Sequence, residues 1–356
     1  MTFHDPHDEV REQAWRLYDK GDLAGALALW RQIARGCPEA EDLCSLALTA
    51  RRLGEVEEAE AALLKAVTID PSLRLAHVML CRNAVGNGSW ADAEFRARRA
   101  LDLEEDGDVY DLLGLTLDAL DRYDEAHAAF SRGIEIDPTY EDLYSDFGQL
   151  VRKRDPVEAE RLFRKAIELE PAYAEAHREL GSLLLHQEAA VFRQKLLDEA
   201  EHHLRLAIEL DPGDTWARLY LGNLHYTRND PRAALVELRL AHESAPSWAV
   251  TMWCLADCHA ELEEWAKAEE LYLRALAAEP DSIHANRALA RMYMLQGRTE
   301  LAQTYFGRVL LLNPEDKGAR EGMERTEDGA GVPKHVARRV HRRQSRWQRR
   351  RDPDSV

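Results

Sequence analysis

Two cysteines and a histidine form the group of side chains in this chain that most resembles a metal site. Cys254 and Cys258 are four residues apart, so both thiols fall on one side of a helix, with His259 beside them. Cysteine and histidine are the ligands that zinc prefers in proteins. The segment also contains Leu255 and Ala256 and is expected to pack as a helix, in which cysteine serves as a small core residue. We therefore predict buried thiols and no metal site.

Motifs for the common enzymatic chemistries are missing from the sequence. It contains no G-x-x-x-x-G-K-[ST] loop to cradle phosphate, no H-E-x-x-H zinc motif and no G-x-S-x-G nucleophile turn. The sequence thus predicts a protein that is not an enzyme and carries no cofactor.

Composition narrows the class of protein. The net charge of the 356 residues is −18, although residues 334–351 contain nine Lys or Arg and no acid, which leaves about −27 on the remainder. No run of 18 apolar residues predicts a transmembrane segment, and the acidic start MTFHDPHDEV does not resemble a signal peptide. Five cysteines without a C-x-x-C pair are typical of reduced thiols. These features predict a cytoplasmic protein.

The elements that would position any site repeat along the chain. Alanines recur at steps of 33, 34, 33, 33, 41, 34, 34 and 34 residues, at Ala26, Ala59, Ala93, Ala126, Ala159, Ala200, Ala234, Ala268 and Ala302. Twelve residues after each stands a proline or, once, a glutamate, at Pro38, Pro71, Glu105, Pro138, Pro171, Pro212, Pro246, Pro280 and Pro314. A fixed period of this length indicates stacked repeats, each ended by a residue that cannot continue a helix.

Two further columns predict how each unit packs. Small residues recur in the first half of each unit, at Ala14, Ala47, Cys81, Gly114, Gly148, Gly181, Gly222, Ala256 and Ala290. Bulky residues, with one exception, stand four positions after the alanines, at Trp30, Leu63, Ala97, Phe130, Phe163, Leu204, Leu238, Tyr272 and Phe306. Small residues allow two helices to approach closely, so each unit is predicted to be a helix pair.

The small, small, large, proline pattern resembles the tetratricopeptide repeat (TPR) family. The resemblance implies an all-α, right-handed superhelical solenoid of antiparallel helix pairs, whose first helices line a concave groove that binds peptides or proteins. The predicted nine repeats are 7–39, 40–73, 74–106, 107–140, 141–173, 174–214 with an insertion, 215–248, 249–282 and 283–314. Residues 1–6 precede them, 315–328 form a capping helix, and 329–356 form a linker and a disordered Arg-rich tail.

The family pattern also implies which side chains face the groove. Aromatic residues, arginines and one asparagine fall on these positions, at Trp15, Tyr18, Arg82, Arg178, Trp216, Asn223, Tyr226, Trp253, Arg287 and Arg291. Trp, Tyr and Arg are enriched in binding hot spots. The alternative is that some of these rings pack as core.

One specialised partner is disfavoured. TPR proteins that bind heat-shock chaperone tails clamp a terminal carboxylate with Lys, Asn and Arg. The corresponding positions here hold Arg11, Trp15, Ser45, Leu75 and Met79. The asparagines are missing, so we do not expect binding of such a tail.

The sixth unit is seven residues longer than its neighbours. Seven residues are about two helical turns, so each helix of the pair could lengthen by one turn. Val191, Phe192 and Leu196 would then lie on a projecting contact surface. A loop insertion that folds back on itself is the alternative.

The last segment leaves several kinds of partner open. Its cationic and aromatic residues are Lys334, Arg338, Arg339, Arg342, Arg343, Arg346, Trp347, Arg349, Arg350 and Arg351. Arginines with one tryptophan suit nucleic acid, an anionic membrane surface, an acidic protein or the acidic groove of the same chain. We therefore predict a protein-interaction scaffold or adaptor. The alternatives are an RNA- or DNA-associated adaptor tethered by the tail and a scaffold autoinhibited by it.

Overall fold

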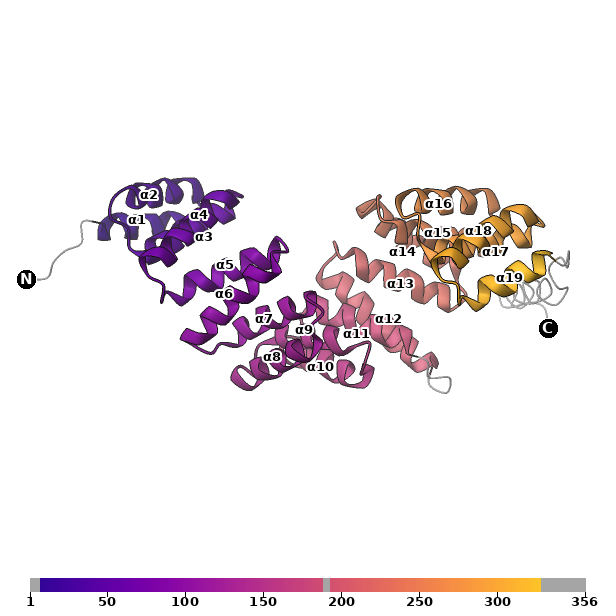
Figure 1. The fold of residues 1–356 in the computed structure, drawn as a ribbon, viewed down its shortest axis with the longest axis horizontal. Coiled ribbons are helices and arrows are strands. Elements are labelled where there is room, and N and C mark those ends of the chain that lie inside the picture. Colours follow the sequence, from indigo (N-terminus) through magenta and orange to yellow (C-terminus); the bar gives the residue numbers. More distant parts are fainter. Residues whose placement is uncertain (1–6, 188–192, 328–356) are drawn as a thin grey trace, which may run out of the picture. The chain divides into compact units, whose positions relative to one another are not determined.

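The computed structural model describes residues 7–187 and 193–327, in which all regular secondary structure is helical (Figure 1). Nineteen α-helices lie in these residues, and contacts between a first helix and the helix that follows it join eight pairs: α1 with α2, α3 with α4, α5 with α6, α7 with α8, α9 with α10, α13 with α14, α15 with α16 and α17 with α18. The predicted all-α architecture of antiparallel helix pairs is confirmed.

The first helices of the pairs, together with α19, are of similar length. They are α1 (Asp8–Asp19), α3 (Ala40–Arg52), α5 (Arg74–Gly86), α7 (Gly107–Ala119), α9 (Glu141–Val151), α11 (Ala174–His186), α13 (Thr215–Thr227), α15 (Ala249–Glu261), α17 (Ile283–Leu295) and α19 (Lys317–Glu327). The second helices are α2 (Leu23–Arg35), α4 (Val56–Ile69), α6 (Trp90–Leu103), α8 (Tyr123–Ile136), α10 (Pro156–Leu169), α12 (Arg193–Leu210), α14 (Pro231–Ser244), α16 (Trp265–Ala278) and α18 (Thr299–Leu312).

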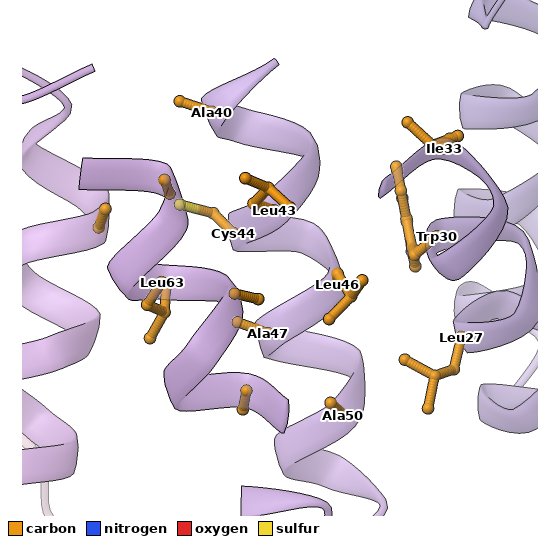
Figure 2. Packing of buried hydrophobic residues seen from close by; sticks show 14 of the residues in the cluster. Leu27, Trp30, Ile33, Ala40, Leu43, Cys44, Leu46, Ala47, Ala50 and Leu63 are labelled. Atoms are coloured by element: carbon orange, nitrogen blue, oxygen red, sulfur yellow. The ribbon is translucent and has the colours of Figure 1, made fainter. Parts of the chain in front are cut away.

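The chain divides into two compact units, Met1–Leu183 and Leu184–Val356. In unit 1, a buried cluster includes Leu27 and Trp30 of α2, Leu43 of α3 and Leu63 of α4 (Figure 2). In unit 2, buried clusters join successive pairs in the same way, and one of them runs from Ala256 to Ala319. Each core is continuous over several pairs, as expected where single repeats cannot bury their own apolar faces.

The small and bulky columns meet inside each pair. A Cβ atom at Gly148 would lie 2.6 Å from the Phe163 ring, so only glycine allows this approach of α9 to α10. The third pair inverts the sizes: Cys81 replaces the smaller residue and Ala97 the larger one, and both are fully buried. The departure predicted at Ala97 is therefore accompanied by a larger residue in the facing column.

A left-handed residue closes the turn between the two helices of most pairs. Positive φ angles occur at Gly21, Gly54, Gly88, Asp121, Asn229, Glu263 and Gly297, which follow the repeat period. Glycine and asparagine adopt this conformation at low cost, whereas Glu263 is the kind of residue that rarely does.

The prolines follow the ends of the second helices as predicted, and most of their carbonyl groups also form a hydrogen bond with a polar side chain of the next unit. For example, α8 ends at Ile136, two residues before Pro138. Six residues after most of these prolines, a polar side chain bonds to the proline carbonyl; these side chains are His77, Tyr144, His177, Arg218, Asn286 and Arg320. Glu105, which replaces a proline, instead accepts hydrogen bonds from Arg132 Nη2 and the Tyr110 hydroxyl, both at 2.7 Å.

The insertion of the sixth unit lengthens its second helix. The 18-residue α12 is four residues longer than α10, whereas α11 has the 13 residues usual for a first helix. The added turn therefore lies in the second helix alone.

Helix α19 packs on α17 and α18, where a capping helix was expected, with Ala319 fully buried.

Candidate functional site

The cysteines of unit 2 are part of the core. Cys254 and Cys258 are buried, and burial raises the pKa of Cys258 to about 12 and that of Cys254 well above its usual value. The buried His259 places Nδ1 2.7 Å from Glu264 Oε2. Residues 7–187 and 193–327 contain no group of three His, Cys, Asp or Glu side chains arranged to hold a metal ion. These thiols act as small apolar groups at neutral pH.

Neighbouring first helices contact one another directly in both units. In unit 1, α7 contacts both α5 and α9, and in unit 2, α15 contacts both α13 and α17. Side chains that project from these helices therefore lie close to side chains from the next pair. Each unit has a first-helix surface that can bear a multi-residue site.

An aromatic cluster lies at the start of α13 in unit 2. We give this name to Trp216, Tyr220 and Trp248. The Trp216 ring stacks on Tyr220 with centroids 5.9 Å apart, and it lies 4.8 Å from Trp248, the residue before α15. Trp216 remains 43% exposed. A large apolar surface thus stays accessible although the ring is held on two sides.

Other groove candidates of unit 2 are held more firmly. Asn223 accepts a hydrogen bond from Cys254 Sγ at 3.3 Å. Trp253 packs against three buried clusters and makes a tilted ring contact with His284, with centroids 4.0 Å apart. Tyr226 is half-buried, and burial followed by the charge of Asp257 raises its pKa. The alternative role in core packing applies most strongly to Trp253.

The two arginines of α17 differ in their partners. Arg287 Nη1 lies 2.8 Å from Asp316 Oδ2, so its charge is neutralised at the edge of α19. Arg291 is exposed and makes no ion pair with any side chain that the structure describes. Its positive charge acts on Tyr226 of α13. Arg291 is therefore the available cation of this surface.

The N-terminal aromatic candidates of unit 1 form a smaller group. Trp15 is 39% exposed and makes edge contacts with Tyr18 and the buried Trp30, both at 5.4 Å between centroids. The Arg52 guanidinium lies 4.9 Å from the centre of the Tyr18 ring. Arg11, at a clamp position, is instead paired with Asp42 at 2.7 Å.

The remaining arginine candidates of unit 1, Arg82 and Arg178, are bonded to carboxylates. Arg82 Nη2 donates to Asp108 Oδ1 at 2.5 Å. Arg178 donates to Glu175 at 2.6 Å and to Glu179 at 3.1 Å. These arginines therefore face acidic neighbours on the adjacent or the same first helix.

We call a set of carboxylates near these arginines the acidic face. It comprises Asp108 and Asp111 of α7, Asp142 and Asp146 of α9, and Glu175 and Glu179 of α11. Three guanidinium groups, those of Arg82, Arg152 and Arg178, pair with three of these six carboxylates, Asp108, Glu175 and Glu179. The acidic face thus has an excess of negative charge.

Two carboxyl groups at the centre of the acidic face have raised pKa values. Burial, followed by the charges of Asp146, Asp142 and Asp108, raises the pKa of Asp111 to about 9. Burial and the charge of Glu175 raise the pKa of Asp146 to about 7. Perturbed carboxyl groups of this kind are frequent at functional sites.

The groove prediction did not include these carboxylates. Asp111 stands three residues before Gly114, the repeat position that Arg178, Trp253 and Arg287 occupy in their own units. The signal in the sequence is a pair of acids three or four residues apart in three consecutive first helices. It is visible only when the units are compared column by column for charge.

A cleft of about 320 Å³ opens at the carboxyl ends of α7 and α9. Asp118, Asp121, Lys153 and Arg154 bring both charges to its wall. Gln149, also in the wall, lies 3.3 Å from Asp146 and 3.4 Å from Glu175. The cleft therefore adjoins the acidic face within unit 1.

Val191, Phe192 and all the candidate residues of the segment 334–351 lie outside the described residues. Leu196 lies in the first turn of α12 and is half-buried.

Protein-family models match most of the chain. One model described as tetratricopeptide repeat matches residues 11–73, 149–215 and 255–319, and a second with the same description matches residues 107–140. No curated protein is similar in sequence. Among the described helices, none is long and apolar enough to cross a membrane.

Solved structures share the fold at low sequence identity. The chain resembles the APC/C hetero-tetramer Cut9–Hcn1 with a TM-score of 0.63 and 16% identity, over 86% of this chain and 59% of that one. It resembles the human IFIT1 dimer with PPP-AAAA with a TM-score of 0.60 and 18% identity, over 90% of this chain and 82% of that one. It resembles Pseudomonas aeruginosa PilF with a TM-score of 0.51 and 19% identity, over 60% of this chain and 95% of that one. Together with the paired helices and their repeat columns, the family matches establish that this chain is a tetratricopeptide repeat protein.

Proposed function

We propose that the chain is a non-catalytic scaffold that binds a partner protein through its first-helix surfaces. Membership of the TPR family supports protein partners in general. The observation that carries the proposal for this chain is the aromatic cluster of unit 2, where Trp216 is 43% exposed between Tyr220 and Trp248.

The packing of the cluster favours a binding role. Contacts to Tyr220 and Trp248 hold the Trp216 ring before a partner arrives, so little conformational entropy is lost on binding. Tryptophan and tyrosine in such positions are typical anchors of protein interfaces. Trp253 serves this role less well, because its ring supports buried residues.

The cation of the same surface suggests the chemistry of the partner. Arg291 has no carboxylate partner among the described residues, whereas Arg287 is already paired with Asp316. A peptide with an aromatic or aliphatic anchor and an acidic residue would complement both the aromatic cluster and Arg291.

A site-specific crosslinker tests the proposal. The photoreactive amino acid p-benzoylphenylalanine in place of Tyr220 should give a defined adduct with the partner in cells. The same residue in place of Leu311, which is 85% exposed on the second helix α18, is the matched control. Adducts at both positions, or at neither, would remove the support for this surface.

A quantitative variant separates binding from folding. Trp216→Ala should lower the affinity for the crosslinked partner about ten-fold or more, as hot-spot truncations do. Leu311→Ala should leave the affinity unchanged. Equal affinities for the two variants would count against the aromatic cluster as the anchor.

The Arg-rich segment favours a second candidate function, binding to RNA or DNA. Its nine Lys or Arg residues lie between 334 and 351. Truncation after Pro333 should then abolish nucleic-acid binding, and binding by the full chain should weaken steeply with salt. If truncation instead raises the affinity for the protein partner, the autoinhibited scaffold is the better account.

A further inference from the structure

Asp111 is the exception among the buried carboxylates that the structure describes. The residue is only 5% exposed, and its Oδ1 atom has no hydrogen-bond partner. No described cation lies within ion-pair distance of its carboxyl group. A buried carboxylate without a partner is costly, since burial removes its hydration and nothing replaces it.

Every other buried carboxylate in residues 7–187 and 193–327 has a partner. In unit 1, Asp42 is paired with Arg11 and Glu179 with Arg152, both at 2.7 Å. In unit 2, Asp316 is paired with Arg287 at 2.8 Å, and Asp214 accepts the backbone N–H of Ala217 at 2.9 Å. The protein thus satisfies such groups as a rule, and Asp111 departs from the rule.

The surroundings of Asp111 add negative charge. Asp108, Asp142 and Asp146 are the acidic groups that act on it, and Arg82 is the cation that does so. Arg82 itself is bonded to Asp108 at 2.5 Å, and Asp142 and Asp146 receive only neutral donors, Tyr173 and Gln149. Arg82 is thus already paired with Asp108, and no described cation forms an ion pair with Asp111.

We infer that the acidic face binds an extended, basic segment of a partner protein, with Arg or Lys side chains seated at Asp111 and Asp146. The inference rests on the scaffold function proposed above but not on the aromatic cluster. Guanidinium–carboxylate pairs supply both the charge and the hydrogen-bond donors that Asp111 lacks.

The spacing of the helices sets the spacing of the basic residues. Packed helices lie about 10 Å apart, and a chain in the extended polyproline II conformation rises about 3.1 Å per residue with three residues per turn, so side chains three apart point to the same side. A segment that crosses α7, α9 and α11 would therefore place a basic residue on each helix when such residues are three apart. The motif is R-x-x-R-x-x-R, with Lys allowed in place of Arg.

Fluorescence anisotropy with short peptides tests this inference on the full chain. The probe is a labelled Ac-RSSRSSR-NH2 peptide, compared with Ac-RRRSSSS-NH2 of the same composition and with a version in which citrulline replaces arginine. We expect the spaced peptide to bind about ten-fold more tightly than the clustered one, and the citrulline version not to bind.

Charge-matched variants locate the site. Asp111→Asn with Asp146→Asn should weaken binding of the spaced peptide at least ten-fold. Glu57→Gln with Asp124→Asn makes the same two acid-to-amide changes at exposed positions of unit 1 and should change the affinity less than two-fold. Equal losses in the two double variants would show nonspecific attraction and overturn the inference.

Further outcomes are decisive as well. The basic segment of the chain itself could compete with the peptide for the acidic face. A variant in which the arginines between 338 and 351 are changed to glutamine removes this competition. If the peptide binds neither the parent nor this variant, the inference is overturned. Displacement of the peptide by 1 mM CaCl2 or MgCl2 at constant ionic strength would assign the site to a metal ion instead. Trp216→Ala should leave peptide binding unchanged, which separates this test from that of the aromatic cluster.

Discussion

Gly114 on α7 lies against Phe130 on α8 so closely that a Cβ atom at position 114 would be 2.6 Å from the phenylalanine ring. Real Cβ atoms do not approach other atoms to this distance. The contact shows why the repeat pairs a small residue with a bulky one, since the bulk of the second helix fills the space that the first helix leaves empty.

Gly114→Ala should destabilise the protein by about 1–3 kcal/mol, because the added methyl group overpacks the interface with Phe130. The measurement is the free energy of unfolding in urea. Gly86→Ala is the control, since a Cβ there meets no atom within 4 Å and should be neutral or stabilising by up to about 1 kcal/mol. Equal stability of the two variants would contradict this account of the pairing.

The inverted third pair allows a double-mutant cycle. Ala97→Phe alone should overpack against Cys81, whereas Ala97→Phe combined with Cys81→Gly restores the size order of the other pairs. The double variant should recover about 1 kcal/mol or more relative to the sum of the single effects. Urea unfolding of the four proteins gives the coupling, and strict additivity would indicate that the two columns pack independently here.

Asp111→Asn should stabilise the protein increasingly as the pH rises. The folded pKa of Asp111 is about 9, above the value of about 3.9 for an unperturbed aspartate. Between these values the unfolded state releases the proton and the folded state keeps it, so the parent loses stability with rising pH. The asparagine side chain does not titrate.

The melting temperatures of the two proteins test this at pH 6 and pH 9. The difference in favour of Asp111→Asn should be larger at pH 9. Asp124→Asn, at an exposed position, serves as the control and should show no such trend. A constant difference would mean that Asp111 ionises normally in the folded protein.

Trp216 and Trp253 should separate in their effects on stability. Trp253→Ala should cost about 2–4 kcal/mol because the ring packs on buried clusters of unit 2. Trp216→Ala should cost less than about 1 kcal/mol, since much of its ring faces solvent. Chemical denaturation of both variants measures these losses. A larger loss for Trp216→Ala than for Trp253→Ala would mean that Trp216 is the core residue and Trp253 the exposed one.

The sequence alone determined the helix pairs and their family. Proline after eight of the nine second helices and the small and bulky columns act through local contacts, and nine units in phase make the pattern specific. Even the departure at Ala97 is visible in the sequence, and the larger Cys81 stands in the facing column. Such local constraints determine an element wherever they occur in the chain.

The tertiary structure decided which of the candidate residues remain available. Arg82 and Arg178 resemble free cations in the sequence, but Arg82 pairs with Asp108 of the adjacent first helix and Arg178 pairs with Glu175 and Glu179 of its own helix. Trp253 and Trp216 are both tryptophans on first helices, and only packing by neighbouring pairs distinguishes their exposure.

The acidic face depends on the structure for the same reason. Its carboxylates are spread over more than 70 residues of sequence, and stacking of α7, α9 and α11 brings them together. Burial and charge are properties of what surrounds a side chain in space. The sequence therefore determined the frame of helix pairs, whereas the structure decided that Asp111 is, among the buried carboxylates it describes, the one that lacks a partner.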